Sequence, residues 1–506
     1  MKTHVAAVDC GTSAVKTALF DLQGGIRGLA IRECPCAFHR DGRIEQDPAR
    51  LSATVFDALR ETLRKSRVSP GSVAAIAVAN QRATVIAVGG DGEPAGPAIS
   101  WQDMRGAGEI ERFRRVMDDR RYYRETGLPN NPVFSLAKIL WIRRHDPRHY
   151  RRTARFLLVH DFVARELGVD GFLSDWSNAS LTGLMELARF RWSADILGAA
   201  GLDPAKLPDL VPPGIPIGAV SRRAAGRSGG LLAGTPIVSG AGDQQCAGLG
   251  AGAVEPGRVA ITLGTAGVAF AFADRPIRDP RRRIMCCAHA VAGKWNVEGL
   301  QNSAGASLQW LCRLLNGGTP FAGSWFRKAE RAPPGSRGVR FYPFLAGASA
   351  PNWNPEARAV FLGLEQRHDQ YDLLRAVMEG VSLETRQILE AFEGLGVSVR
   401  RIRLTGGCAR IETWNRIQAD LQGRPLAASA CPEATLLGAG ILAACGSGCH
   451  SSARQAVRAM VHDARTYAPD PRARRSYDRL YESYVEGYRL MNESGLFRVT
   501  AGGVDS

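Results

Sequence analysis

A short stretch near the N-terminus combines a carboxylate, small hydroxyl side chains and an amine. In VAAVDCGTSAVKTALFD, residues 5–21, Asp9 precedes the turn Gly11–Ser13, and Lys16 follows it. The exposed N–H groups of such a turn can hold an anion, and a neighbouring lysine adds a compact positive charge. A hairpin tip also needs glycine for its geometry, so this segment alone leaves an ordinary turn as the alternative.

The same pattern occurs again half a chain further on. RVAITLGTAGVAFAFAD, residues 258–274, aligns with the first stretch at an offset of 253 residues and places Gly264 and Thr265 at its tip. Thr262 stands where the first copy has Asp9. Two phosphate-binding turns of which one carries a carboxylate suit a metal–nucleotide site, because Mg²⁺ needs only one or two protein oxygens and phosphates supply other ligands. The repeat predicts a duplicated architecture.

Strands followed by glycine turns and helices are expected around these residues. PIVSGAGDQQCAGLG, residues 236–250, predicts a strand, a Gly-Ala-Gly turn and a helix that starts at Asp243. Residues 401–426 predict a strand, a turn at Gly406–Gly407 and an amphipathic helix, and residues 372–392 carry a helical apolar stripe. Because strands alternate with helices in both halves, the fold class is α/β.

Length and composition indicate a globular protein of at least two domains. The 506 residues are too many for one compact core, while 45% hydrophobic and 23% charged residues are ordinary shares. No apolar run approaches the roughly 20 residues of a membrane span, so neither a membrane partner nor secretion is expected. The 11 cysteines lack the spacing of zinc ligands, which predicts reduced thiols and a cytoplasmic protein.

A net charge of +16 raises the question of nucleic-acid binding. The arginines are spread along the chain, and local runs such as Arg281–Arg283 lack the interleaved aromatic side chains of a base-stacking surface. We therefore expect solvated basic faces that attract anionic substrates, and no nucleic-acid partner. A salt-dependent shift of labelled nucleic acid would test the alternative.

Together these motifs resemble the FGGY family of carbohydrate kinases, over nearly the whole chain. Residues 357–380, ARAVFLGLEQRHDQYDLLRAVMEG, follow the second signature of that family throughout, and SLAKILWIRRH at residues 135–145 meets the first in part, with Val133 departing from it. Further matches are DCGTS, GAGDQ, TLGTAG, SAGASLQWL, LTGGCAR and PEATLLGAGILAA. The resemblance implies a two-domain actin, hexokinase and Hsp70-like (ribonuclease H-like) fold with duplicated halves around a cleft. It divides the chain into residues 1–250, residues 251–466, and a C-terminal helix and tail at residues 467–506.

The resemblance also implies a role for single positions. Asp243 matches the general base that accepts the proton of the attacking sugar hydroxyl, with a helix N-cap as the alternative. Asp9 matches the carboxylate that holds Mg²⁺. Positions that match ATP contacts are Thr12, Ser13, Lys16, Gly264, Thr265, Gly305, Gly406 and Gly407. Candidate substrate contacts are Gln81, Arg82, Trp101, Asp103, Asp243 and Gln244. Gly305 fits a helix start equally well, and Glu433 and Gly438 are interpreted as structural residues beside the adenosine-binding turn at Gly406 and Gly407.

The identity of the acceptor is less clearly indicated. The loops at residues 80–84 and 100–105 are similar to those of glycerol kinases, but Ala83 and Val133 stand where those enzymes carry a glutamate and an aromatic residue. Xylulokinases usually have Met-His at the positions of Gln81 and Arg82. A xylulose-like pentulose is the favoured acceptor, with another ketose or polyol, or an unusual alcohol, as alternatives.

Two further interpretations remain open at this point. An ATPase of the same fold that drives a partner protein is an alternative to a sugar kinase, although the chain adds no peptide-binding domain. In the tail, Tyr477, Tyr481, Tyr484 and Tyr488 form a one-sided stripe on a predicted helix. Packing against the core or against a second copy in a homodimer explains such a stripe.

Overall fold

Two compact units make up the chain in the computed structural model, which describes residues 2–501. The first unit comprises the chain up to Val254 together with Phe272–Asn296 and Glu433–Val461. The second comprises Glu255–Ala271, Val297–Pro432 and the chain from His462 onward. The division into residues 1–250, 251–466 and 467–506 stays a prediction about domains.

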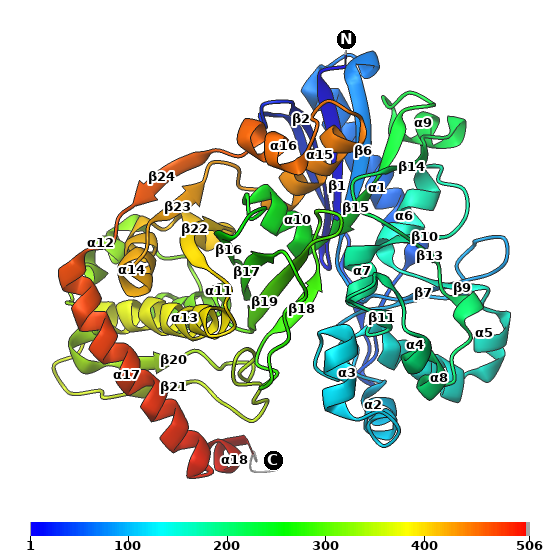
Figure 1. Cartoon of the computed structure of the whole chain (residues 1–506). Helices are drawn as coiled ribbons and strands as arrows, with labels where there is room; N and C mark the ends of the chain where they lie inside the picture. Colours follow the sequence, from blue (N-terminus) through cyan, green and yellow to red (C-terminus); the bar gives the residue numbers. More distant parts are fainter. Residues whose placement is uncertain (1, 502–506) are drawn as a thin grey trace. The chain divides into compact units, whose positions relative to one another are not determined.

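The first unit is built on a six-stranded sheet of order β14-β15-β6-β1-β2-β3 (Figure 1). Its strands are β1 (His4–Cys10), β2 (Ala14–Asp21), β3 (Ile26–Glu33), β6 (Val73–Asn80), β14 (Pro216–Ala219) and β15 (Pro236–Gly242). Its smaller strands are β4 (Ala37–Phe38), β5 (Ile44–Gln46), β7 (Ile86–Val88), β8 (Ala98–Ile99), β9 (Arg155–Leu157), β10 (Leu173–Asp175), β11 (Met185–Glu186), β12 (Arg191–Trp192), β13 (Asp209–Val211) and β18 (Met285–Ala288). Alternating apolar residues place side chains such as Val8 and Leu19 in a core shared with helix α1.

Some helices of the first unit cover this sheet, and others lie in the long connections between its strands. They are α1 (Pro48–Ser66), α2 (Ala107–Arg114), α3 (Asp119–Thr126), α4 (Ser135–His145), α5 (Pro147–Arg152), α6 (Val159–Leu167), α7 (Trp176–Ser180), α8 (Ala194–Ala200), α9 (Arg222–Ser228), α10 (Asp243–Gly250), α15 (Ala434–Gly446) and α16 (Ala453–Met460). Helix α1 packs on β2 and β3, and α15 packs on β1, β6 and β15. Helix α15, far away in the sequence, thus lies next to the predicted site residues of this unit.

The second unit is built on the part β19-β17-β16-β22-β23-β24 of a seven-stranded sheet (Figure 1). These strands are β16 (Gly257–Leu263), β17 (Gly267–Ala273), β19 (Trp295–Gln301), β22 (Val399–Thr405), β23 (Leu426–Ser429) and β24 (Asp463–Tyr467). The remaining elements are β20 (Arg340–Tyr342), β21 (Val360–Leu362), α11 (Gly305–Asn316), α12 (Gly323–Ala329), α13 (Gln370–Glu393), α14 (Glu412–Gln422), α17 (Pro471–Glu493) and α18 (Leu496–Ala501). The predicted apolar stripe forms α13, where a Cβ on Gly380 would lie 2.1 Å from the backbone oxygen of Phe341.

The two sheets share one topology, which confirms the predicted duplication. Neighbouring strands from β14 through β15, β6 and β1 to β2 pair in the order antiparallel, parallel, parallel, antiparallel. The strands from β24 through β23, β22 and β16 to β17 pair in the same order. The predicted hairpins are β1–β2 and β16–β17, each at the same position of its own sheet.

One local prediction is wrong. Gly240, Ala241 and Gly242 do not form a turn but belong to β15, where the pairing with β6 shifts register between Val238 and Ala241. A Cβ on Gly240 would lie 1.7 Å from the backbone oxygen of Val78, so glycine here permits a close strand approach. The expected helix start at Asp243 is confirmed.

The tyrosine stripe of the tail lies on α17 and contributes to the core of the second unit. Tyr477 and Tyr484 are fully buried. The Tyr477 hydroxyl donates to Glu379 at 2.9 Å, and the ring of Tyr484 stacks on Tyr342 at 4.5 Å between centroids.

Among residues 2–501, no helix is long and apolar enough to cross a membrane. All 11 cysteines are free, as the sequence predicts.

Candidate active site

Asp9 lies near the tip of the first hairpin, directly across from Lys16 in the antiparallel register. The Lys16 ammonium forms an ion pair with Glu433 Oε2 at 2.7 Å. Burial, together with the negative charges of Asp243 and Glu433 and against the opposing charge of Lys16, raises the pKa of Asp9 to about 7. Within the described residues, Asp9 Oδ1 is buried and has no hydrogen-bond partner. Such a carboxylate oxygen is suited to a hard cation.

Asp243 is the first residue of α10 and directly follows β15. The Nε atom of Arg82 lies 3.2 Å from Asp243 Oδ1, and the side chain of Asp243 is 30% exposed. The N-cap of α10 is Gly242 rather than Asp243. Asp243 is therefore a solvent-accessible carboxylate, fixed at a strand–helix junction and close enough to Asp9 for their charges to interact.

The turn between β1 and β2 brings further predicted residues together. The indole Nε1 of Trp101 donates a hydrogen bond to Thr12 Oγ1 at 2.9 Å. Ser13 is exposed, and its backbone oxygen accepts from the amide of Cys34 at 2.9 Å. The structure thus joins a predicted sugar-loop residue to the predicted phosphate loop.

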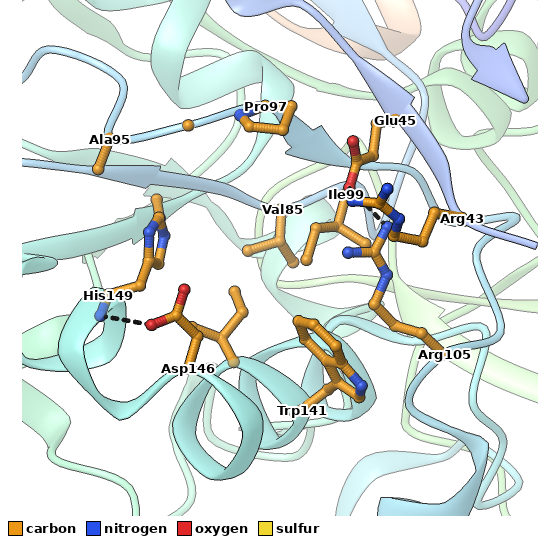
Figure 2. A pocket seen from close by; sticks show the side chains of 13 residues that line it. Arg43, Glu45, Val85, Ala95, Pro97, Ile99, Arg105, Trp141, Asp146 and His149 are labelled. Atoms are coloured by element: carbon orange, nitrogen blue, oxygen red, sulfur yellow. Dashed lines mark hydrogen bonds and ion pairs between the residues drawn. The ribbon is translucent and has the colours of Figure 1, made fainter. Parts of the chain in front are cut away.

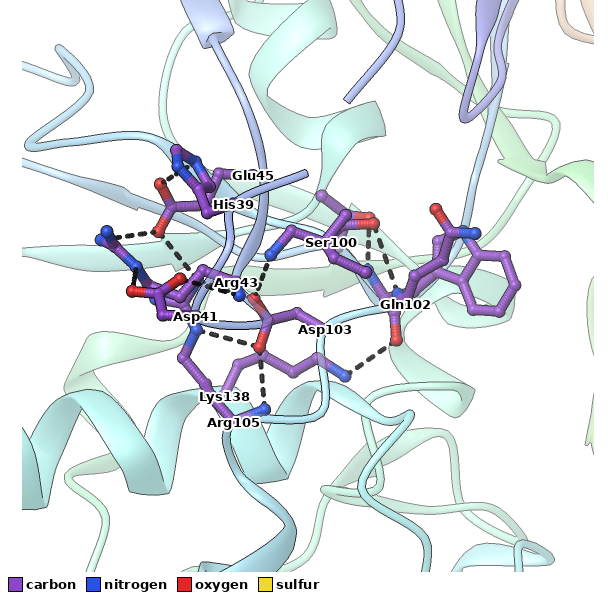
Figure 3. A network of polar contacts seen from close by, with 12 residues as sticks. His39, Asp41, Arg43, Glu45, Ser100, Gln102, Asp103, Arg105 and Lys138 are labelled. Atoms are coloured by element: carbon purple, nitrogen blue, oxygen red, sulfur yellow. Dashed lines mark hydrogen bonds and ion pairs between the residues drawn. The ribbon is translucent and has the colours of Figure 1, made fainter. Parts of the chain in front are cut away.

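Asp103 (Figure 3), by contrast, is engaged inside the unit, and so is Gln81. Asp103 is fully buried, and its carboxylate accepts from the amide of Ile44 at 2.7 Å and from the Arg105 guanidinium. Burial alone would raise the pKa of Asp103, but the hydrogen bonds from Arg105 and Ile44 hold it below its usual value. Gln81 donates to Gln46 Oε1 at 2.8 Å and is 1% exposed. These contacts orient the loops rather than present a free polar group.

Lys138 holds the backbone of two loops at this place (Figure 3). Its Nζ donates to the backbone oxygens of Trp101, Pro132 and Val133 at 3.1, 2.7 and 2.7 Å. Burial lowers the pKa of Lys138 to about 7, against the attraction of Asp103.

Two further residues of the predicted substrate loops need a separate account. Ala83 has a φ of 63°, which is uncommon for a residue other than glycine. Gln244 is partly exposed at the start of α10.

A separate pocket of about 260 Å³ lies beside this network (Figure 2). Glu45 and Arg105 stand at one end and Asp146 at the other, and the guanidinium of Arg105 lies 5.0 Å from the ring centroid of Trp141. None of the predicted site residues lines it. Arg105 pairs with both Asp103 and Glu45, so the pocket wall and the loop network are one charged cluster.

In the second unit, the tip of the β16–β17 hairpin is bound to the start of α11. The amides of Gly305 and Ala306 donate to the backbone oxygens of Gly264 and Thr265 at 2.8 and 3.0 Å. A Cβ on Gly305 would lie 2.5 Å from the Gly264 oxygen, so this glycine is required by close packing at a helix start.

The predicted adenosine turn lies at the end of β22. Gly406 has a φ of 86°, and a Cβ there would lie 2.6 Å from the backbone oxygen of Leu263. A pocket of about 250 Å³ lies beside it, lined by Thr405, Gly406, Ala409, Arg410, Ser429 and Pro432 among others. No other atom would lie within 4 Å of a Cβ on Gly407, which leaves room at this turn.

Comparison with known proteins identifies the family. The FGGY family of carbohydrate kinases matches through its N-terminal domain at residues 4–250 and its C-terminal domain at residues 259–447. The chain belongs to this family. It is accordingly an ATP-dependent phosphotransferase with an alcohol group as acceptor.

Named FGGY relatives cover almost the full length. The chain is 28% identical to the xylulose kinase of Bacillus subtilis over 96% of both chains, and 28% identical to the gluconokinase of the same organism over 97% of this chain and 96% of the relative. It is 31% identical to the glycerol kinase of Alkalilimnicola ehrlichii over 87% and 89%. The solved xylulose kinase of Rhodospirillum rubrum superposes with a TM-score of 0.90 at 27% identity, over 98% of this chain and all of that one.

The FGGY resemblance left one contact of the site unassigned. Glu433 was expected to be a structural residue beside the adenosine turn, yet it belongs to the first unit and pairs with Lys16. Gly438 is structural as expected, since a Cβ there would lie 1.9 Å from the backbone oxygen of Cys246 in α10. The sequence shows only that Glu433 follows Pro432 at an expected helix start. This position does not indicate that Lys16 is its ion-pair partner.

Proposed function

We propose that this FGGY kinase transfers the γ-phosphoryl group of ATP to a hydroxyl of a ketose or polyol, with a xylulose-like pentulose as the favoured acceptor. The observation that carries the proposal is the carboxylate pair of the first unit. Asp243 is accessible and held by Arg82, while Asp9 keeps a buried oxygen without a protein partner among residues 2–501. This reaction needs one carboxylate as a general base and another as a cation ligand.

Asp243 is the proposed general base. As the acceptor oxygen bonds to the γ-phosphorus, the bond from that phosphorus to the β–γ bridging oxygen breaks and ADP leaves. The proton of the hydroxyl passes to the carboxylate of Asp243. Arg82, whose Nε lies 3.2 Å from Asp243 Oδ1, orients that carboxylate. Positioned base catalysis of this kind contributes roughly 10²–10⁴-fold to the rate.

Asp9 is the proposed ligand of Mg²⁺, directly or through water. Its unpartnered Oδ1 fits a cation, and the neighbouring charges of Asp243 and Glu433 favour one there. Bound Mg²⁺ supplies positive charge that offsets the charge of the phosphates. No cluster of three or more histidine, cysteine or acidic residues able to hold a metal occurs among the described residues. A site completed by phosphates and water does not need one.

The nucleotide is proposed to use both glycine-tipped hairpins. In the first unit Thr12, Ser13 and Lys16 offer N–H, hydroxyl and ammonium donors. In the second, Thr265 is proposed to offer N–H and hydroxyl donors to the phosphates, and Gly264, whose own amide donates to the Ala266 oxygen at 3.0 Å, to leave room for them. Gly406, which lines the pocket of about 250 Å³, and the adjacent Gly407 are the proposed adenosine site. We keep Gly305 as a support of the phosphate loop, because its own amide is bonded to Gly264.

The acceptor is proposed to lie against Trp101, Arg82, Gln244 and Asp243. Asp103 and Gln81 act behind this surface, since both are buried and engaged with neighbouring side chains. Ala83 and Val133 leave hydroxyls of glycerol without the partners that glycerol kinases offer, which favours a longer acceptor. Relatives named xylulose kinase support the pentulose.

The cytoplasm is the proposed compartment, which the free cysteines support. The proposed partners are the sugar and ATP, without nucleic acid or membrane, and a homodimer is compatible with the exposed face of α17. The alternative function, an ATPase of the same fold, predicts ATP hydrolysis at the same rate with and without sugars, and this distinguishes it from a sugar kinase.

A coupled ADP-release screen over ketoses, polyols, aldoses and aldonic acids tests the proposal. We expect the highest kcat/KM for a pentulose. Asp243→Asn in the same assay should lose at least about 10²-fold in kcat while ATP still binds. A folded Asp243→Asn enzyme that keeps about a third of the wild-type kcat would show that the base lies elsewhere. Release of ADP that no acceptor accelerates would refute the kinase itself.

A further inference from the structure

A buried set of polar side chains surrounds the strand end that carries Asp243. It is formed by Asp175 at the end of β10 and by Ser177 and Asn178 in α7, and all three are fully buried. Burial of charged and polar groups is costly unless they are paired, because they lose their hydration. Their partners show what they hold in place.

The first partner is the residue immediately before Asp243. The amide of Gly242 donates to Ser177 Oγ at 2.9 Å, and Ser177 Oγ in turn donates to Asp175 Oδ1. Gly242 is the N-cap of α10 and offers no side chain of its own to fix the helix start. The Ser177 hydroxyl therefore fixes the backbone from which the Asp243 carboxylate projects.

The second partner is the strand that carries Arg82. Asn178 Nδ2 lies 2.5 Å from Asp175 Oδ2 and donates to Asn80 Oδ1 at 2.9 Å. Asn80 is the last residue of β6, two positions before Arg82. Asp175 thus connects, through one neighbour on each side, to the strand ends that carry Asp243 and its ion-pair partner.

A third contact holds the irregular part of β15. Where the register with β6 shifts, the amide of Gly240 donates to His160 Nε2 at 3.1 Å. Because this nitrogen accepts, the ring proton lies on Nδ1, which donates to Asp161 Oδ1 at 3.1 Å. The amide of Gly240, within the register shift, and the amide of Gly242, the last residue of β15, are therefore both bound by buried side chains from residues 160–178.

We infer that Asp175 and Ser177 are positioning residues for the general base, and that they set the place of Asp243 through the amide of Gly242. The inference rests on the proposed function, because it assigns a purpose to the exact position of that carboxylate. A displacement of about 1 Å at a reacting group can cost roughly 10²-fold in rate. A hydroxyl that fixes the preceding amide therefore acts on kcat without touching either substrate.

The first test is kinetic and uses the full-length enzyme with its best acceptor. Ser177→Ala should lower kcat about 10- to 100-fold and change the KM of both substrates less than about 3-fold, while Ser177→Thr, which retains the hydroxyl, restores much of the rate. Ser180→Ala is the matched control: that residue lies in the same helix, is 1% exposed, and donates only to the Ser177 backbone oxygen at 2.7 Å. Its rate should stay near the wild-type value.

A double-mutant cycle separates positioning from general stability. If Ser177 acts through Asp243, Ser177→Ala should have almost no further effect on kcat in an Asp243→Asn background. A loss of equal size in both backgrounds, or no loss in the single variant, would overturn the inference. Should Ser177→Ala fail to fold, Asp175→Asn takes its place in the same cycle, because it weakens the acceptor of the Ser177 hydroxyl.

Hydrogen exchange gives a readout that needs no acceptor. In Ser177→Ala, the segment 240–244 should exchange faster, because the Gly242 amide loses its partner, whereas Ser180→Ala should match the wild type. Unchanged exchange in Ser177→Ala would contradict the contact on which the inference depends. If the wild-type protein phosphorylated no acceptor, the proposed function would be wrong, and this measurement would still decide whether Ser177 holds the strand end.

Discussion

Removal of the Asp9 carboxylate should make the protein more stable and less active at once. Asp9→Asn keeps the size of the side chain and deletes a charge that is buried beside Asp243 and Glu433. The pKa of Asp9 rises from an ordinary 3.8 to about 7, a difference of about 3 units at about 1.36 kcal/mol each. That product, about 4 kcal/mol, is a ceiling. Because water partly reaches the residue, we expect a gain of about 2–4 kcal/mol in the free energy of unfolding at pH 8.

The sign of the pH dependence follows from proton uptake. Between about pH 4 and pH 7 the unfolded chain has released the Asp9 proton while the folded protein keeps it, so wild-type stability falls as the pH rises. Asp9→Asn lacks this pH-dependent contribution to stability. The stability difference between variant and wild type should therefore grow from about pH 4 to pH 7 and stay constant above.

Urea denaturation at a series of pH values, followed by tryptophan fluorescence, measures this difference. Asp41→Asn is a suitable control, because Asp41 is exposed and hydrogen bonds from the Arg43 amide and guanidinium lower its pKa. Added Mg²⁺ and ADP should raise the Tm of the wild type more than that of Asp9→Asn. A stability difference that does not change between pH 4.5 and pH 8, or an Asp9→Asn protein less stable at pH 8, would refute this account of Asp9.

Three further outcomes are expected. Gly264→Val should fold, because a Cβ there meets only the Ala266 oxygen at 3.7 Å, and should weaken ATP binding and transfer together; unchanged ATP affinity and rate would count against the second phosphate loop. Lys138→Met should raise the acceptor KM, because the backbone oxygens of Trp101, Pro132 and Val133 lose the donor that holds their loops; an unchanged KM would contradict this. Glycerol should show a lower kcat/KM than the best five- to seven-carbon acceptor, and equality would show that Ala83 and Val133 do not select against it.

The sequence sufficed for features that depend on local pattern. The two hairpins, the strand and helix that flank Asp243 and the long helix α13 all follow from apolar periodicity and glycine position, and the repeat at an offset of 253 residues anticipated two sheets of one topology. The error at Gly240–Gly242 has a physical reason. Glycines signal a turn and a close strand approach equally well, and only the position of Val78 decides between them.

Contacts between distant segments could not be predicted in this way. Lys16 and Glu433 are 417 positions apart, and nothing near either residue names the other. SDWSNAS, residues 174–180, has the composition of a helix start, with Asp175 as a natural N-cap. The hydrogen bond that Ser177 accepts from the amide of Gly242 depends on how α7 packs against β15. A pattern of residue types does not contain this information.

The duplication allows Asp9 to be compared with the residue at the equivalent position of the second hairpin, Thr262. Thr262 and Asp9 occupy equivalent positions of the two hairpins but differ in their hydrogen bonding. The Thr262 hydroxyl is hydrogen-bonded to Thr405 Oγ1 at 2.9 Å, whereas Asp9 Oδ1 has no partner in the described chain and its carboxyl has a raised pKa. A satisfied hydroxyl stabilises the fold, while an unpartnered buried carboxylate opposes it. Since threonine is compatible with this place in the repeated fold, we propose that the carboxylate of Asp9 serves binding rather than folding, and that the cation is the ligand that compensates its cost.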